Sequence, residues 1–293
     1  MNLNTELKSN KAHMLGAIYF TLSVTLMGLT DAISKQLSFT LPVSEIVTLR
    51  CMFSALLLLP FIGKMQIGKY TKVHLARSVM YVPAILLCTY GVTKVHIVIA
   101  TIVGFTIPLF TLAFAAILLK EKVKIQRWIA AIIAFCSIYI CSEQKGAIDI
   151  HVVALAGSAC IFALMEIFNK MLVNSTSIPL LDSIFFSSLL SGIMVAPLVF
   201  FEWNAPNIQE IGLLTALSVA GNAIFFFMIT AYKYTDLSSL APYRYLEIIF
   251  TTIVGYLWFG EIPSGNIWIA AAIIICITAW STYSEFFSNK TKV

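Results

Sequence analysis

The sequence predicts an all-α membrane protein with ten transmembrane helices, arranged as two five-helix repeats of inverted topology. Three observations support this: the composition, a series of long apolar runs, and an internal repeat. Of the 293 residues, 59% are apolar and 11% are charged, whereas soluble domains are about half apolar and a quarter charged. The chain lacks the polar surface of a soluble protein, which excludes a soluble enzyme and a nucleic-acid-binding domain.

Long apolar runs define the predicted helices. A helix that crosses a bilayer needs roughly 20 predominantly apolar residues. Ten such runs follow one another with only short turns between them, so no soluble domain fits in the chain. The predicted spans are residues 13–36, 44–63, 73–92, 96–119, 126–142, 150–171, 179–200, 210–232, 238–259 and 265–284.

The distribution of Lys and Arg gives the orientation. Of the 19 basic residues, 14 fall on the side of the N-terminus and only Lys35, Lys94 and Lys145 fall on the other side. Arg50 and Arg244 lie within spans. Because cytoplasmic loops carry the excess of Lys and Arg, we expect a multi-pass protein with both termini in the cytoplasm.

An internal repeat relates the two halves, which we place at residues 1–145 and 146–293. Three features of the first half recur in the second at offsets of 135, 137 and 140 residues. They are Asp31-x-x-x-Lys35 and Glu166-x-x-x-Lys170, Pro42 with Glu45 and Pro179 with Asp182, and Glu121 with Trp128 and Glu261 with Trp268. Each half has five spans, an odd number, so the halves are inverted. Inverted repeats are typical of alternating-access carriers whose site lies between the halves.

The ninth span holds the densest set of candidate site residues, Ala241-Pro242-Tyr243-Arg244-Tyr245-Leu246-Glu247. Ionisable groups inside a membrane are costly and mark functional sites. Arg244 and Glu247 are three residues apart and share a helix face. A guanidinium suits a substrate carboxylate, and Glu247 suits an ammonium. The alternative is a structural ion pair between these two residues.

The sixth span offers Phe162, Glu166 and Asn169 as candidate site residues. Glu166 lies one turn deeper than Lys170, with which it could instead form an ion pair. A role of Glu166 in binding a substrate or a proton is as well supported as this structural role.

The corresponding charges of the first half favour structural roles. Asp31 and Lys35 lie near the end of the first span, where Lys35 can extend to the interface. Arg50, about two turns into the second span, is expected to pair with Glu45 or Asp31.

The fourth span contains Gly104-Phe105-Thr106-Ile107-Pro108. Pro108 removes the hydrogen-bond partner of the Gly104 carbonyl, and such freed backbone is tolerated at membrane depth where it lines a cavity. Phe105, Phe162, Tyr243 and Tyr245 lie away from the interfaces and are candidate partners for a cationic substrate. The alternative for these rings is ordinary packing.

Other motifs give no sign of catalysis, metal binding or a cofactor. Residues 63–69 match GxxxxGK, but Tyr70 follows where a phosphate-binding loop has Ser or Thr. The six cysteines form no CxxC pair, and the spans contain neither HExxH nor GxSxG. We therefore expect no enzyme, no cofactor and no metal.

Several stretches resemble one transporter family. They are Thr106–Leu112, Gln126–Trp128, Asn169-Lys170, Ala241–Glu247 and Tyr283–Glu285. With the ten spans, they resemble the EamA branch of the drug/metabolite transporter superfamily. Within that branch they resemble most the S-adenosylmethionine uptake transporters of obligate intracellular bacteria such as Rickettsia. In the superfamily, spans 4 and 9 line the central cavity.

The resemblance implies import of S-adenosylmethionine, in exchange for S-adenosylhomocysteine, across a bacterial inner membrane. Arg244 would hold the carboxylate of the substrate, and Glu247 or Glu166 its ammonium. Tyr243, Tyr245, Phe105 or Phe162 would face the sulfonium or stack on the adenine. The alternative is an exporter of amino acids or a related zwitterionic metabolite with the same fold. The expected partners are thus a small molecule and the lipid bilayer, and the oligomeric state is left open.

Overall fold

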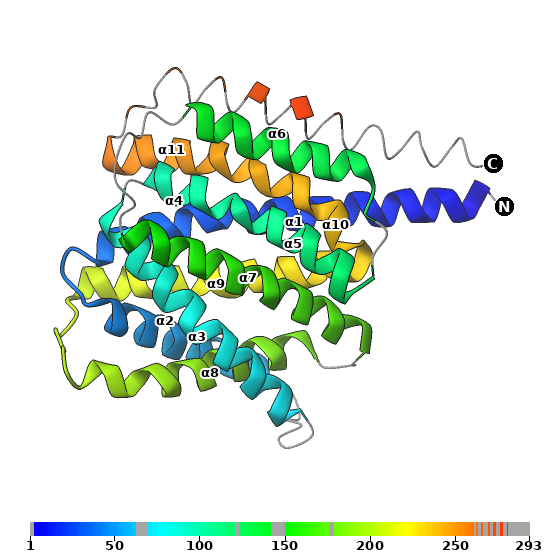
Figure 1. Ribbon diagram of the computed structural model, residues 1–293. Helices are drawn as coiled ribbons and strands as arrows, with labels where there is room; N and C mark the ends of the chain where they lie inside the picture. The colour runs from blue at the N-terminus through cyan, green and yellow to red at the C-terminus, as the bar shows by residue number, and fades with distance from the viewer. Residues whose placement is uncertain are drawn as a thin grey trace.

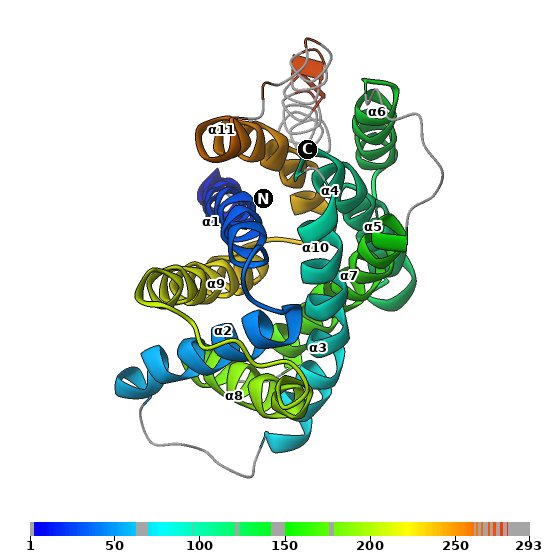
Figure 2. The ribbon, with the colours of Figure 1, turned by 90° about the vertical axis from the view of Figure 1, so that its left-hand side faces the viewer.

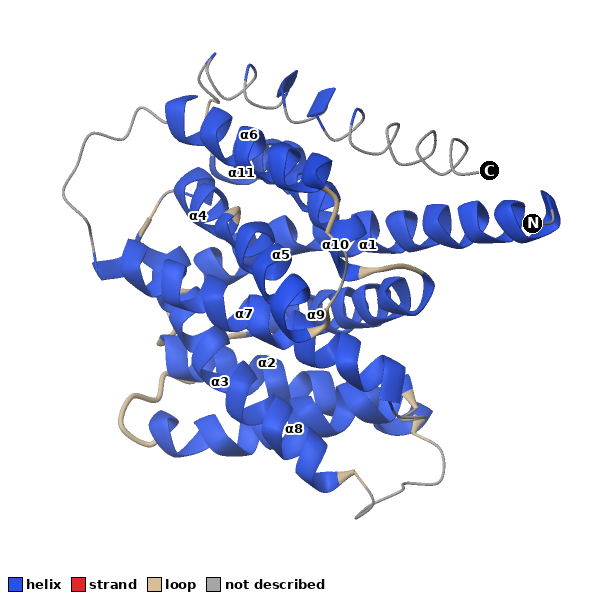
Figure 3. Ribbon diagram, turned by 45° about the vertical axis from the view of Figure 1, so that its right-hand side comes forward, coloured by secondary structure: helices blue, strands red, loops and turns tan. Residues whose placement is uncertain are grey.

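The computed structural model describes residues 3–62, 70–95, 97–120, 123–141, 150–175 and 179–260, with isolated positions between 262 and 280. Across these residues every regular element is a helix and there is no strand (Figure 3). The predicted all-α fold is therefore confirmed for this part of the chain.

Six helices are long and apolar enough to cross a membrane. They are α1 (Leu3–Leu37), α2 (Val43–Leu58) with the 3-10 turn Leu59–Phe61 that continues it, α3 (Thr71–Lys94), α7 (Ile150–Ser175), α8 (Leu180–Val199) and α9 (Ile208–Tyr234). They coincide with the first, second, third, sixth, seventh and eighth predicted spans. The chain is thus a multi-pass membrane protein.

The fourth and ninth predicted spans are broken rather than continuous. The fourth is α4 (Ile97–Gly104) followed by α5 (Thr106–Leu118), and the ninth is α10 (Leu237–Leu240), a 3-10 segment (Ala241–Leu246) and α11 (Glu247–Phe259). A proline ring clashes with the carbonyl four residues earlier, which for Pro108 is that of Gly104, the last residue of α4. Pro242 likewise lies at the start of the 3-10 segment.

The predicted count of ten continuous spanning helices is not confirmed. Two spans are interrupted, and the fifth corresponds to α6 (Ile125–Cys141), after which residues 142–149 lie outside the described part of the chain. The tenth, residues 265–284, lies outside the continuously described part of the chain. The prediction missed the breaks because an apolar run reports burial in lipid but not helix continuity.

The helices lie roughly side by side in one bundle (Figure 1). Viewed along the bundle, α2 and α8 lie at one edge and α6 and α11 at the opposite edge (Figure 2). Helix α1 packs against α9, α3 packs against α7, and α2 packs against α8. The first span of each predicted repeat thus contacts the third span of the other, which is the pairing that interleaved repeats produce.

A close approach between α1 and α11 holds the broken ninth span in place. A Cβ atom on Gly28 would lie 2.9 Å from the Thr251 hydroxyl oxygen and 3.2 Å from the Thr251 Cα. Any larger residue at this position would require α1 or Thr251 to shift. The close approach brings the Asp31 turn of α1 and the Glu247 turn of α11 to the same side of the bundle.

Candidate functional site

A cavity lies between α1, α2, α3, α4, α5, α7, α9 and the 3-10 segment with α11. It has about 1040 Å³ of atom-free space, counting the part open to solvent. Helix α7 forms one continuous wall, with lining residues from Leu155 to Asn169. At 1.5 Å per residue this wall is about 21 Å long, so the cavity is elongated along α7.

Five charged side chains lie in the wall of this cavity. They are Asp31, Arg50, Glu166, Arg244 and Glu247. Most of the other lining residues are apolar, among them Ile85, Val92 and Ile224. A single charge at the centre of a membrane helix costs about 3 kcal/mol or more. Five charges around one cavity are therefore a strong indication of a polar substrate.

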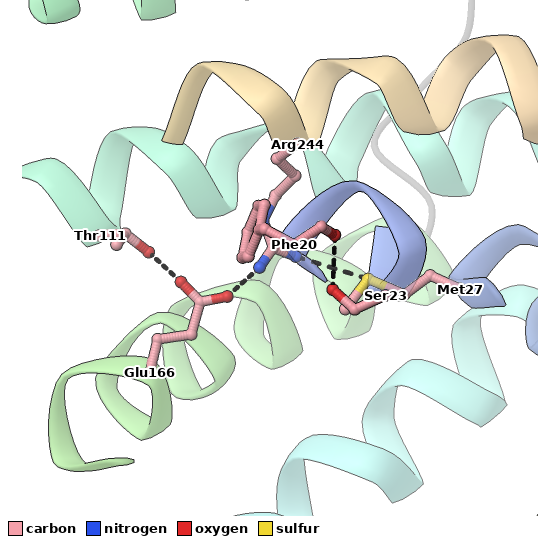
Figure 4. A network of polar contacts seen from close by, with 6 residues as sticks. All are labelled: Phe20, Ser23, Met27, Thr111, Glu166 and Arg244. Atoms are coloured by element: carbon pink, nitrogen blue, oxygen red, sulfur yellow. Dashed lines mark hydrogen bonds and ion pairs between the residues drawn. The ribbon is translucent and has the colours of Figure 1, made fainter. Parts of the chain in front are cut away.

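Arg244 forms an ion pair with Glu166 across the cavity (Figure 4). Glu166 also accepts a hydrogen bond from the Thr111 hydroxyl at 2.8 Å. The Arg244 guanidinium lies over the Phe20 ring, 5.4 Å from its centroid, and one of its nitrogens is 3.7 Å from the Met27 sulfur. Arg244 is therefore fixed by contacts from α1 and α7.

These contacts differ from the two pairs that the sequence suggested. The structural alternative paired Arg244 with Glu247, yet its guanidinium reaches Glu166 on another helix. A Glu166–Lys170 pair was the other possibility, but the Lys170 ammonium donates to the Tyr232 and Thr235 carbonyls, at 2.6 and 2.7 Å. Sequence spacing predicts neighbours along one helix and does not detect partners on other helices.

Arg50, Asp31 and Glu247 form the second group of charges in the cavity wall. Within the described part of the chain, no hydrogen bond joins the Arg50 guanidinium to another residue. A Cβ atom on Gly221 would lie 3.2 Å from one of its terminal nitrogens, so α9 leaves just enough room for this side chain. Asp31 interacts electrostatically with Arg50. Arg50 thus presents open donor positions to the cavity.

Asn169, at the far end of the α7 wall, presents an unsatisfied amide. It is 3% exposed, and among the described residues its side-chain nitrogen has no hydrogen-bond partner. Burying such a donor without a partner costs about 1–3 kcal/mol. Phe162 lies two turns earlier on the same wall. Asn169 thus offers an amide at this end of the wall, and Phe162 offers an aromatic ring near its middle.

The structure brings five of the eight predicted site residues to the cavity and places three in packing clusters. Arg244, Glu247, Glu166, Asn169 and Phe162 line the cavity. Phe105 and Tyr245 contact each other with ring centroids 5.2 Å apart, and the Tyr245 hydroxyl donates to the Ala131 carbonyl at 2.9 Å. Tyr243 packs against the cluster that contains Phe20. These rings match the packing alternative in this conformation.

Two cavity residues, Asp31 and Arg50, were given structural roles from the sequence. Glu45, one suggested partner of Arg50, instead accepts a hydrogen bond from the Asn204 backbone at 3.0 Å. Asp31, the other, lies with Arg50 on the cavity wall. The signal was present, since Arg50 lies two turns inside an apolar span, where an ionisable group marks a site by default.

Comparison with known families identifies the fold. The model of the EamA-like transporter family matches the chain twice, at residues 14–142 and 150–283. The chain belongs to the EamA-like transporter family. The match covers most of the chain and includes every charged residue of the cavity. The protein is therefore an EamA-family transporter built from two repeats.

Named relatives of this EamA-family member transport different substrates. The S-adenosylmethionine uptake transporter of Rickettsia prowazekii (strain Madrid E) is 32% identical over 287 residues, 96% of this chain and 97% of the relative. The riboflavin transporter of Vibrio cholerae is 26% identical, over 94% of this chain and 96% of the relative. The pseudopaline exporter of Pseudomonas aeruginosa is 22% identical, over 89% and 93%.

The fold itself is also found in a solved structure. A protein known from a crystal structure matches with a TM-score of 0.74 and 16% sequence identity, over 94% of this chain and 97% of its own. At this identity the likeness concerns the fold alone.

Proposed function

We propose that this EamA-family transporter imports S-adenosylmethionine across a bacterial inner membrane, in exchange for S-adenosylhomocysteine. The observation that carries the proposal is the identity of 31–32% to four Rickettsia S-adenosylmethionine uptake transporters, over 94–97% of the chain. The riboflavin and pseudopaline transporters are less similar, at 22–26% identity. The Lys and Arg distribution supports cytoplasmic termini.

The cavity offers a partner for each charged group of this substrate. We assign the carboxylate to Arg50, because Arg244 is already engaged by Glu166. Asp31, beside Arg50, receives the ammonium, so that the amino-acid moiety binds across two opposite charges. Glu247 supplies a negative charge for the sulfonium. These assignments keep the predicted role of Glu247 as the partner of a cation.

The adenine belongs at the other end of the α7 wall. An amide side chain can donate to and accept from the edge of adenine, and Asn169 has an unsatisfied buried donor. The Phe162 ring offers a surface for stacking. The wall is long enough to place adenine here and the amino-acid group at Arg50. Glu166 lies between Phe162 and Asn169 on this wall, so its ion pair with Arg244 borders the adenine.

Exchange follows from what an empty cavity leaves unpaired. Without a substrate, the Arg50 guanidinium and the Asn169 amide nitrogen have no hydrogen-bond partner among the described residues. Closing the cavity around them therefore carries a desolvation cost. A bound zwitterion removes this cost, so the loaded protein changes conformation more readily than the empty one. After releasing one substrate, such a carrier binds a second substrate before it changes back to the first conformation, which results in exchange.

Uptake of labelled S-adenosylmethionine into proteoliposomes tests this function. We expect saturable uptake that is stimulated when the vesicles are preloaded with S-adenosylhomocysteine. Arg50→Gln should raise the KM for uptake about 10- to 100-fold, because a hydrogen bond to a charged group contributes about 1.5–3 kcal/mol. Lys233→Ala, which removes an exposed cation of α9, is the matched control and should behave like the unmodified protein.

The second candidate is export of an amino acid or a related zwitterion. The similarity to the pseudopaline exporter supports this alternative. The opposite charges of Arg50 and Asp31 would bind such a molecule as well. If amino acids are exchanged and S-adenosylmethionine neither enters nor competes, export of these metabolites replaces the proposed function.

A further inference from the structure

The charges of the cavity do not sum to zero. Three carboxylates and two guanidinium groups line it, so its formal charge is −1 when all five are ionised. The Arg244–Glu166 ion pair is neutral by itself. The surplus negative charge therefore belongs to the group formed by Asp31, Arg50 and Glu247. This surplus charge matters when the imported and the exported substrate differ in charge.

The two proposed substrates differ by one unit of charge. S-adenosylmethionine carries a carboxylate, an ammonium and a sulfonium, which gives +1, whereas S-adenosylhomocysteine has lost the sulfonium charge and is neutral. The cavity is thus neutral with the first substrate and carries −1 with the second. Enclosing an uncompensated charge within the membrane is strongly unfavourable. The complex with S-adenosylhomocysteine needs one further cation.

We infer that a proton accompanies S-adenosylhomocysteine, so that the exchange is electroneutral. This inference rests on the proposed function. A carboxylate of the cavity takes up one proton on the side where S-adenosylhomocysteine binds. It releases that proton on the opposite side, where S-adenosylmethionine replaces it. One positive charge moves in each direction, and the O–H bond of the carboxyl group forms and breaks once per cycle.

Glu247 is the carboxylate that carries the proton. Glu166 is held by Arg244 and Thr111, and Asp31 lies beside Arg50. Glu247 is 9% exposed, and no hydrogen bond to its carboxylate is present among the described residues. The charged or titratable groups that act on it are Asp31 from α1, Cys88 from α3 and Arg244 from its own segment. Helix α4, packed against α11, has no titratable residue.

Proteoliposomes loaded with S-adenosylhomocysteine and a pH-sensitive dye test the inference. The membrane potential is clamped with potassium and valinomycin while labelled S-adenosylmethionine is added outside. We expect the accumulation ratio to be independent of the potential and to rise about tenfold per pH unit of interior acidity, since one proton leaves per substrate. Electrogenic exchange would instead change the ratio about 50-fold per 100 mV.

Two variants make the test specific. Glu247→Gln removes the surplus charge, so its remaining exchange should become potential-dependent and release no proton. Glu202→Gln, which removes an exposed carboxylate outside the cavity, should exchange one proton like the unmodified chain. If Glu247→Gln is inactive, proton release and potential dependence in the unmodified chain still decide whether a proton accompanies S-adenosylhomocysteine.

Each other outcome overturns a defined part of the argument. Potential-dependent exchange without proton release by the unmodified chain overturns the inference and leaves the proposed function intact. Potential-independent exchange without proton release overturns it as well and assigns the compensating charge to another ion. Absence of any exchange between the two substrates overturns the proposed function, and the inference with it.

Discussion

The two halves of the molecule use the same device to hold their first and third spans together. In the first half, the Lys35 ammonium donates to the Val95 carbonyl at the end of α3, at 3.3 Å. In the second half, Lys170 donates to the Thr235 carbonyl at the end of α9, at 2.7 Å. The acids one turn earlier, Asp31 and Glu166, both line the cavity.

The halves differ where the broken fourth span of each meets the cavity. Gly104 and Ile107 of the first half correspond to Arg244 and Glu247 of the second at an offset of 140 residues, and all four line the cavity. The two halves thus share the cavity acids Asp31 and Glu166, whereas the broken fourth span supplies charges to the cavity only in the second half. A repeat that kept charges at both positions would place two more ionisable groups in the membrane.

Among the changes that test this difference between the halves, removing Arg244 should have the largest effect on uptake. Arg244→Ala leaves the Glu166 carboxylate buried without its cation, and breaking a buried pair in this way costs about 3–5 kcal/mol. We expect uptake of S-adenosylmethionine to fall at least 100-fold, with the protein still inserted in the membrane. Uptake and the melting temperature in detergent measure the two effects. Normal uptake would exclude Arg244 from the mechanism.

A double variant separates the two consequences of that change. Arg244→Gln with Glu166→Gln removes both charges, so no carboxylate is stranded and the melting temperature should recover most of the loss. Uptake should stay low if the pair acts in transport. Recovery of uptake with stability would show instead that the pair only holds α7 against the 3-10 segment.

The sequence predicted the membrane-spanning helices better than the side chains that line the cavity. Long apolar runs and their flanking charges located the six continuous spans. Prolines did not identify the two interrupted spans, because Pro83 and Pro197 lie inside the continuous helices α3 and α8. Five of the eight predicted site residues line the cavity, and four of these five stood out in the sequence because charged or amide groups inside apolar runs are rare. Arg50 was given a structural role, because its depth in α2 did not reveal that α9 carries Gly221 opposite it. Phe105 and Tyr245 contact each other in a packed cluster, and aromatic composition does not distinguish a cavity wall from a packed interior.

The equivalent lysines should differ in their contribution to stability. Lys170 is 6% exposed and donates to the Tyr232 and Thr235 carbonyls at 2.6 and 2.7 Å. The Lys35 ammonium lies 3.3 Å from the Val95 carbonyl and over the Phe259 ring, so its hydrogen bond is the longer one. A hydrogen bond to a charged group contributes about 1.5–3 kcal/mol. Lys170→Met should therefore lower the melting temperature more than Lys35→Met does. Equal shifts would show that the repeats are equivalent in energy as well as in pattern.

The smallest effect is expected at Gly104, the counterpart of Arg244. A Cβ atom there meets nothing within 4 Å, so Gly104→Ala should leave the KM for uptake within about twofold and slightly favour the helix. Gly221→Ala is the comparison, because its Cβ atom would lie 3.2 Å from the Arg50 guanidinium. Displacing that group should raise the KM severalfold. If Gly104→Ala impaired uptake as much, crowding of the cavity would explain both results, and the charges would not be what distinguishes the halves.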